Sequence, residues 1–134
     1  MDNSSFDNAE QASFYSMLET FIDCALEEAI PSEVKAVCFN LYEDEGSKWS
    51  MEIIGTSSFD KDDPDWACDE VSDFGTRNVP FYWTEETDWE SVLSEITKHL
   101  EIYLSNGACA DKLKSLEGVA VGFTDGNLNI LVGD

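Results

Sequence analysis

Acidic side chains crowd one stretch of the chain, the sixteen residues FDKDDPDWACDEVSDF from position 59 to position 74. Seven of them carry a carboxylate, against the single basic residue Lys61: Asp60, Asp62, Asp63, Asp65, Asp69, Glu70 and Asp73. Carboxylates are the ligands that calcium and magnesium prefer, and paired carboxylates perform glycoside hydrolysis and two-metal nuclease chemistry. Each of these roles requires its own spacing of the carboxylates.

The regular calcium-binding loop does not fit this stretch. A loop of that kind beginning at Asp60 needs glycine at position 65 and glutamate at position 71, where the chain has Asp65 and Val71. An irregular divalent-metal site stays open as an alternative. A glycosidase or a nuclease depends on separations in space that the sequence does not specify, and a nuclease would also lack basic contacts to phosphate.

Histidine and cysteine chemistry receives no support from spacing. His99 is the single histidine, one turn after Ile96 on an apolar stripe, which is typical of a core or boundary histidine whose hydrogen bonds are satisfied. A catalytic triad or a cysteine–histidine pair would depend on this one base. The four cysteines form no C-x-x-C pair, and Cys24 and Cys38 fall in apolar patterns typical of small core residues. We therefore predict no catalytic residue, no metal ligand and no cofactor.

The acidic stretch is better explained as part of the surface. Six uncompensated charges repel one another, and burying ionised carboxylates would cost more still. One interpretation is a loop that is merely solvated. The other, which we favour, is a docking surface for a basic partner, with Trp66 as its apolar anchor. Beside Trp83, three further carboxylates extend the predicted surface: Glu85, Glu86 and Asp88.

The overall charge indicates which partners such a surface would attract. The 134 residues include 29 Asp plus Glu and 7 Lys plus Arg, for a formal net charge of −22. Nucleic acid and anionic membranes would be repelled, so neither is expected as a partner, whereas a basic protein would be attracted. Hydrophobic residues make up 43% of the chain, enough for it to fold despite that charge. Because we find neither a leader pattern nor a membrane-spanning apolar run, we expect a cytoplasmic protein.

The first half of the chain predicts a helix followed by a hairpin. Residues 1–8 are polar and expected to fray. Apolar residues then recur at steps of three and four from Phe14 to Ala29, which predicts an amphipathic helix ended by Pro31.

Next, residues 34–42 and 49–54 are predicted strands of an antiparallel hairpin, joined by a turn at 43–46. Alternation in the second strand leaves Ser50 and Glu52 on a solvent-facing side.

The second half repeats this order after the acidic stretch. A short strand is expected near 67–71 and an edge strand at 81–83. Thr87 and Glu90 form a capping box that predicts the start of a second amphipathic helix, and Gly107 predicts a left-handed end to it.

Beyond that helix, residues 108–116 add a turn or two of helix, and residues 119–123 and 128–132 form a terminal hairpin around Asp125-Gly126. Helices that bracket antiparallel strands predict an α+β two-layer sandwich, with a mainly antiparallel sheet and two long amphipathic helices, in a single domain spanning residues 1–134.

Three features give the chain a family resemblance: the segment Trp66-Ala67-Cys68-Asp69-Glu70, the second amphipathic helix, and the GVAVGFTDG run from Gly118 to Gly126. Across residues 34–132 the chain resembles the small acidic immunity proteins that accompany polymorphic or contact-dependent toxins in bacteria. The resemblance implies cytoplasmic binding of a cognate toxin domain, often a basic nuclease, whose active site is blocked or whose adjacent surface is covered.

Two other functions stay open from the sequence. A nucleic-acid mimic would occupy the groove of a DNA- or RNA-binding protein, and it would need carboxylates spaced like phosphates along a ridge. A small acidic divalent-metal-binding domain is the other alternative. The identity of the partner and the oligomeric state are not specified by the sequence.

Overall fold

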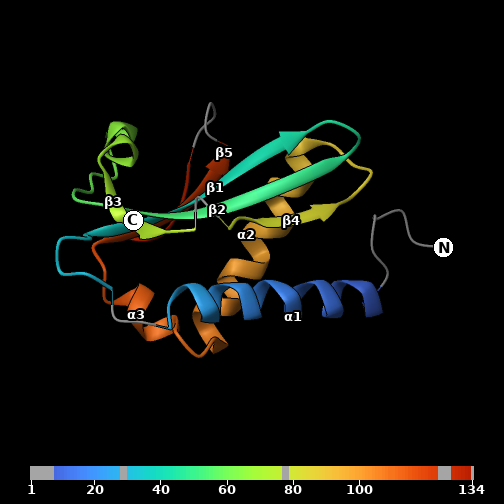
Figure 1. Cartoon of the computed structure of the whole chain (residues 1–134), viewed down its shortest axis with the longest axis horizontal. Coiled ribbons are helices and arrows are strands. Elements are labelled where there is room, and N and C mark those ends of the chain that lie inside the picture. The colour runs from blue at the N-terminus through green and yellow to red at the C-terminus, as the bar shows by residue number, and fades with distance from the viewer. Residues whose placement is uncertain (1–7, 28–29, 77–78, 124–127, 134) are drawn as a thin grey trace.

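A mainly antiparallel sheet with the three α-helices on one face organises the described part of the chain (Figure 1). The computed structural model describes residues 8–27, 30–76, 79–123 and 128–133. Within them the helices are α1 (Asn8–Ala25), α2 (Trp89–Asn106), α3 (Ala110–Lys114) and the 3-10 helix η1 (Pro64–Cys68). The strands are β1 (Ala36–Asp44), β2 (Lys48–Thr56), β3 (Glu70–Gly75), β4 (Phe81–Thr84), β5 (Gly118–Phe123) and β6 (Asn129–Val132). The predicted α+β class is confirmed.

The strands follow the order β3-β2-β1-β5-β6, and β4 also pairs with β2. β1 and β2 are antiparallel in continuous register, from Ala36 opposite Thr56 to Asp44 opposite Lys48, so the first predicted hairpin is confirmed. The terminal hairpin of β5 and β6 is confirmed as well, although its turn at 124–127 lies outside the described residues. β1 and β5 pair in parallel. The sequence does not predict this pairing, because the two strands lie far apart in the chain.

The central strands have apolar side chains on both faces of the sheet, as parallel-paired strands usually do. Val37, Phe39 and Leu41 of β1 belong to the main core, which also contains buried residues of α1, α2 and α3. Ala36 and Cys38 of the same strand belong to a second, smaller core on the opposite face. Each face of β1 therefore needs its own cover.

The helices cover the first face with regularly spaced apolar residues. In α1 and just beyond its end, Leu18, Ile22 and Leu26 are fully buried at steps of four. In α2, Ile96 and Leu100 are buried in the same way. A buried leucine or isoleucine side chain of this kind stabilises the fold by about 1.5–3 kcal/mol relative to an exposed one.

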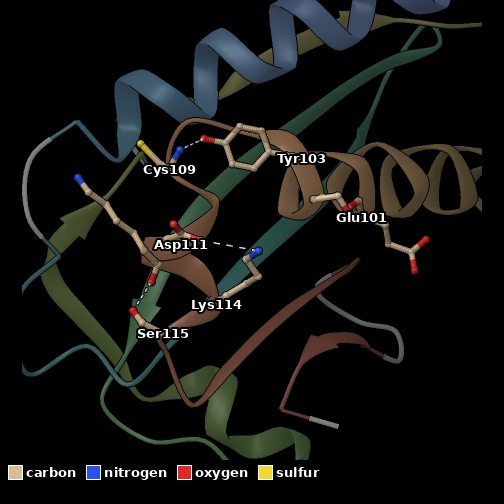
Figure 2. A network of polar contacts seen from close by, with 8 residues as sticks. Glu101, Tyr103, Cys109, Asp111, Lys114 and Ser115 are labelled. Atoms are coloured by element: carbon tan, nitrogen blue, oxygen red, sulfur yellow. Dashed lines mark hydrogen bonds and ion pairs between the residues drawn. The ribbon is translucent and has the colours of Figure 1, made fainter.

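Polar contacts tie the ends of the helices together. The Tyr103 hydroxyl donates to the Asp23 carboxylate at 2.5 Å, which links α2 to α1. The same hydroxyl accepts from the backbone amide of Cys109 at 3.1 Å, at the entry of α3 (Figure 2). The Lys112 ammonium donates to the Leu26 carbonyl at 2.5 Å, just beyond the end of α1. A cation at this position complements the helix dipole.

Both ends of α2 differ from their prediction. Asp88 is the N-cap in place of Thr87, and its Oδ1 accepts from the Ser91 amide at 2.7 Å. Asp and Thr cap helices by the same chemistry, so the pattern could not separate adjacent candidates. Gly107 has a φ of −70°, so the left-handed end is wrong. Glycine is needed there for another reason, because a Cβ would lie 2.5 Å from the Tyr103 ring.

The predicted solvent-facing side of β2 is also wrong. Ser50 is 6% exposed and Glu52 is 4% exposed, and the Tyr42 hydroxyl donates to a Glu52 carboxylate oxygen at 3.1 Å. The alternation itself is correct, but this face of the sheet is covered in part by η1, whose Trp66 belongs to the second core. A period-two pattern shows which residues share a face and does not show what covers that face.

Among the cysteines, Cys38 is buried as predicted, whereas Cys24 is exposed, so the prediction of a core residue there is wrong. Cys24 lies two residues from both Ile22 and Leu26, which puts it on the opposite side of the helical stripe.

Some observed element boundaries also differ from the predicted ones. The strand expected at 67–71 is β3 at Glu70–Gly75, because residues 64–68 form η1. α1 runs from Asn8 to Ala25. Residues 1–7, which were expected to fray, lie outside the described residues, and so does Ala29, the last apolar residue of the predicted helix. Over the described part of the chain, no helix combines the length and the apolar composition needed to cross a membrane.

Candidate functional site

The acidic lobe, residues 57–69, connects β2 to β3 and lies on the side of the sheet away from α1 (Figure 1). Its five aspartates are all exposed and none forms an ion pair with a described residue: Asp60, Asp62, Asp63, Asp65 and Asp69. The lobe therefore presents to solvent five carboxylates that no described cation pairs with, and Lys61 is the cation within its own segment.

Short local hydrogen bonds hold the lobe in shape. Asp60 Oδ1 accepts from the amide of Asp62 at 2.9 Å, and Asp63 Oδ1 accepts from the amide of Asp65 at 3.0 Å. Asp63 thereby caps η1, which begins at Pro64. Asp69 accepts from the Ser58 hydroxyl at 2.6 Å. These are turn-forming bonds of the kind that aspartate commonly makes.

Trp66 is not the exposed anchor that the sequence suggested. It is 4% exposed and belongs to the second core with Ala36, Cys38 and Ile54. Its ring meets Phe59 edge to face at a centroid distance of 5.0 Å. Small side chains of the central strands leave this face in need of a large apolar cover, and Trp66 supplies it. The tryptophan thus fixes the acidic lobe to the sheet and is not available to a partner.

The last two carboxylates of the predicted stretch lie in β3. Glu70 is half-buried and pairs with Thr56 of β2. Asp73 also falls within β3, and the placement of its side chain lies outside what the structure describes.

The second predicted group does not share a surface with the acidic lobe. In β4, Thr84 pairs with Lys48, whereas Glu70 pairs with Thr56, eight residues further along β2. At the usual rise of ~3.3 Å per residue that separation is roughly 26 Å. The acidic surface therefore splits into two regions at opposite ends of β2.

Within that second group, the side chains differ in exposure. Glu86 and Asp88 are exposed, but Trp83 is 9% exposed and Glu85 is 4% exposed, so the expectation that all four form a surface is wrong for these two. Trp83 joins the main core, where its ring lies 5.6 Å from that of Phe14. Hydrogen bonds from Ser91 lower the pKa of Asp88, in keeping with its role as N-cap.

A group of buried polar atoms that the sequence did not predict lies between β4 and the two long helices. Among the described residues, the buried side-chain atoms without a hydrogen-bond partner are Tyr15 Oη, Trp83 Nε1, Glu85 Oε2 and His99 Nδ1. The ring of His99 lies 5.7 Å from Tyr15 and 5.5 Å from Phe14, which in turn contacts Trp83. We call Tyr15, Trp83, Glu85 and His99, together with Glu95, the Glu85 cluster. The expectation that His99 is fully satisfied is wrong.

Burial and mutual repulsion set the protonation of this cluster. Burial raises the pKa of Glu95 to about 8, and hydrogen bonding to Glu85 and its charge add to the rise, while Lys98 opposes it. Burial lowers the pKa of His99, although the charge of Glu85 works the other way. Burial, together with Glu19 and Asp23, raises the pKa of Tyr15. At neutral pH Glu95 is therefore protonated, the imidazole is neutral and the phenol keeps its proton.

One signal in the sequence could have indicated part of this cluster. Glu95 and His99 are four residues apart, so they share a helix face that is otherwise apolar at Ile96 and Leu100. The burial of Glu85 has no such signal, because it follows from the pairing of β4 with β2 and from the bond that the Trp49 indole donates to the Glu85 carbonyl at 2.9 Å.

Comparison of the chain with protein-family models, with curated proteins and with solved structures finds no match.

Proposed function

We propose that this chain is a non-catalytic binding protein that neutralises a basic protein partner in the cytoplasm through its acidic lobe. In its most specific form, the proposal is an immunity protein that blocks a cognate toxin domain, such as a nuclease. One observation carries it: five exposed aspartates that find no cationic partner among the described residues stand on a segment that Trp66 fixes to the sheet.

The acidic lobe concentrates negative charge and holds it in a fixed arrangement. Like charges held close together destabilise the folded chain, so a merely solvated loop would gain by spreading them. Here the turn bonds at Asp60 and Asp63 and the burial of Trp66 keep them together. A preorganised patch loses little conformational entropy when a partner binds. It also steers a basic partner towards itself, which raises association rates by about ten- to a thousandfold.

The other two functions receive less support. Among the described residues, no three His, Cys, Asp or Glu side chains lie where they could share a metal ion. A nucleic-acid mimic needs a continuous ridge of carboxylates, whereas the acidic lobe and the Glu86–Asp88 region stand roughly 26 Å apart along β2. We therefore favour a compact basic patch on a protein as the target.

The experiment that tests this proposal starts from co-expression with the product of the neighbouring gene, followed by co-purification. A partner with a basic surface is expected. The association rate is then measured for the double variant Asp62→Asn/Asp65→Asn, whose two side chains make no hydrogen bond in the lobe and can be changed without disturbing its turns. Glu43→Gln/Glu101→Gln removes the same charge from exposed positions elsewhere and serves as the control.

The size of the effect follows from Coulomb's law. A carboxylate about 5 Å from a partner's cation gains about 0.8 kcal/mol in water, and physiological salt reduces this by about half. Losing two such contacts, about 0.8 kcal/mol in all, should slow association by about fourfold. The control should change it by less than twofold. A partner without a basic surface, or equal effects of the two double variants, would mean that the lobe is only solvated.

A further inference from the structure

The Glu85 cluster contains buried polar atoms that lack a hydrogen-bond partner among the described residues. Glu85 is 4% exposed and Trp83 is 9% exposed, yet Glu85 Oε2 and Trp83 Nε1 find no partner among the described residues. A buried polar atom left unpaired costs about 1–3 kcal/mol. Two more such atoms, on Tyr15 and His99, lie in the same cluster. Four costs gathered in one place indicate a site that something else completes.

Part of the cluster reaches the surface. Tyr15 of α1 and Glu95 and His99 of α2 are partly exposed, whereas Glu85 is buried. The unpaired atoms of Tyr15, Glu85 and His99 are themselves covered, so a ligand reaches them only when one of the partly exposed side chains moves aside.

The types of the unpaired atoms define the chemistry of the missing group. The carboxylate oxygen of Glu85 can only accept a hydrogen bond, a neutral imidazole accepts through its unprotonated nitrogen, and a phenol oxygen accepts as well as donates. These three acceptors match a group with several N–H donors. The indole of Trp83 only donates, so it is not assigned to the ligand. The aromatic rings of Phe14 and Tyr15 lie against His99, and such rings favour a cation over a neutral group.

The charges around the cluster favour the same class of ligand. Glu85 precedes α2, and Glu95 and Lys98 lie within it, while α1 contributes Glu19 and Asp23 beside Tyr15. Four carboxyl groups thus lie in or beside the cluster, and the one opposing charge named here is the ammonium of Lys98. That ammonium acts on Glu95 through its charge and makes no ion pair with a described residue.

We propose that the Glu85 cluster is a binding site for an organic cation, an alkylammonium or alkylguanidinium group carried either by a small amine or by a lysine or arginine side chain. The cation donates to Glu85, His99 and Tyr15 and takes the place of the proton that Glu95 holds. This site lies on the helix-covered side of the sheet, away from the acidic lobe, and does not depend on the function proposed for the lobe (Figure 1).

Exchange of a cation for a proton gives binding a defined pH dependence. Below about pH 8 Glu95 holds its proton, so each cation that binds releases one proton and the affinity rises close to tenfold per pH unit. Above that value the proton is already lost and the affinity levels off. His99 does not compete, because its lowered pKa leaves the imidazole neutral over this range.

The test uses the single histidine as a reporter. The ring signals of His99 are followed by NMR while n-butylammonium chloride is added to the full chain at pH 8. A saturable shift is expected. Tetramethylammonium chloride, which has the same charge and no N–H donor, should bind at least tenfold more weakly. The peptide acetyl-Gly-Lys-Gly-amide, titrated in parallel, shows whether the site prefers a side chain of another protein to a free amine; binding of either supports the proposal.

Variants separate a binding site from a structural role. Glu85→Gln keeps the shape of the side chain and should weaken n-butylammonium binding at least tenfold. Glu101→Gln, an exposed position on the same helix, should leave it unchanged. If Glu85→Gln does not fold, Glu95→Gln at the partly exposed rim replaces it and should abolish the pH dependence. Absence of a saturable shift, equal binding of tetramethylammonium, or wild-type binding by the folded variant would overturn the proposal and leave water as the occupant.

Discussion

Trp66 offers the sharpest test of how the acidic lobe is built, because exposure and burial predict different costs for its removal. The structure buries 96% of it, with 4% exposed. A tryptophan buries about 150–250 Å² of mostly apolar surface, which at about 25 cal/mol per Å² corresponds to roughly 4–6 kcal/mol as an upper limit. Measured truncations of buried Phe and Trp cost about 3–5 kcal/mol. We therefore expect Trp66→Ala to lower the free energy of unfolding by about 3–5 kcal/mol.

A matched control lies on α2, where Trp89 is 50% exposed and meets Phe123 edge to face at 6.0 Å. With about half of the buried area, Trp89→Ala should cost about 1.5–2.5 kcal/mol, half of the cost expected at Trp66. Both variants are compared with the natural chain by urea unfolding, followed by far-UV circular dichroism so that the loss of a tryptophan does not alter the signal. A cost below 1 kcal/mol for Trp66→Ala, or equal costs for the two variants, would refute the burial of Trp66 as the attachment of the lobe.

Three further predictions follow from single groups. Asp88→Ala removes the N-cap of α2 and should lower the midpoint of unfolding in the same urea assay, whereas Thr87→Ala should leave it almost unchanged. Because the folded-state pKa of Glu95 is raised to about 8, its contribution to stability is complete below its unfolded pKa and is lost as the pH rises towards 8. The melting temperature of Glu95→Gln should therefore gain on that of the natural chain between pH 5 and pH 8 and stay parallel above it; a constant difference would contradict the shift. Burial, with the charge of Glu52, raises the pKa of Cys38 to about 12, so iodoacetamide at pH 8 should modify the exposed Cys24 and Cys68 while Cys38 stays unmodified by mass spectrometry.

The fold was predictable where a pattern depends on neighbouring residues. The nine-residue strands of the first hairpin and the stripe of α2 are visible in the sequence, because alternation and three- to four-residue steps record which side chains share a face. The parallel pairing of β1 with β5 is not visible, since it joins strands separated by most of the chain. The cover of the second face is not visible for the same reason, and this is why Ser50, Glu52 and Trp66 were all expected to be exposed.

The candidate site was likewise predictable only where residues close together in the chain determine it. The acidic lobe was predicted as one segment because its aspartates lie close together in the chain, and all of them are exposed. The extension to Trp83 and Glu85 failed, because proximity in the chain to Glu86 and Asp88 does not reveal which side chains turn inwards. The Glu85 cluster depends on α1, β4 and α2 meeting in space, and its cost appears only when hydrogen-bond partners are counted in the folded chain.

The salt dependence of the association rate between this chain and its basic partner tests the central claim most directly. Between about 50 and 300 mM salt the Debye length falls from roughly 14 to 6 Å, so steering by the lobe should weaken steeply. We predict that the natural chain and the Glu43→Gln/Glu101→Gln control lose association rate in parallel, and that Asp62→Asn/Asp65→Asn starts lower and declines less. Equal association rates at low salt for the natural chain and both double variants, followed by parallel losses of rate with salt, would contradict the account.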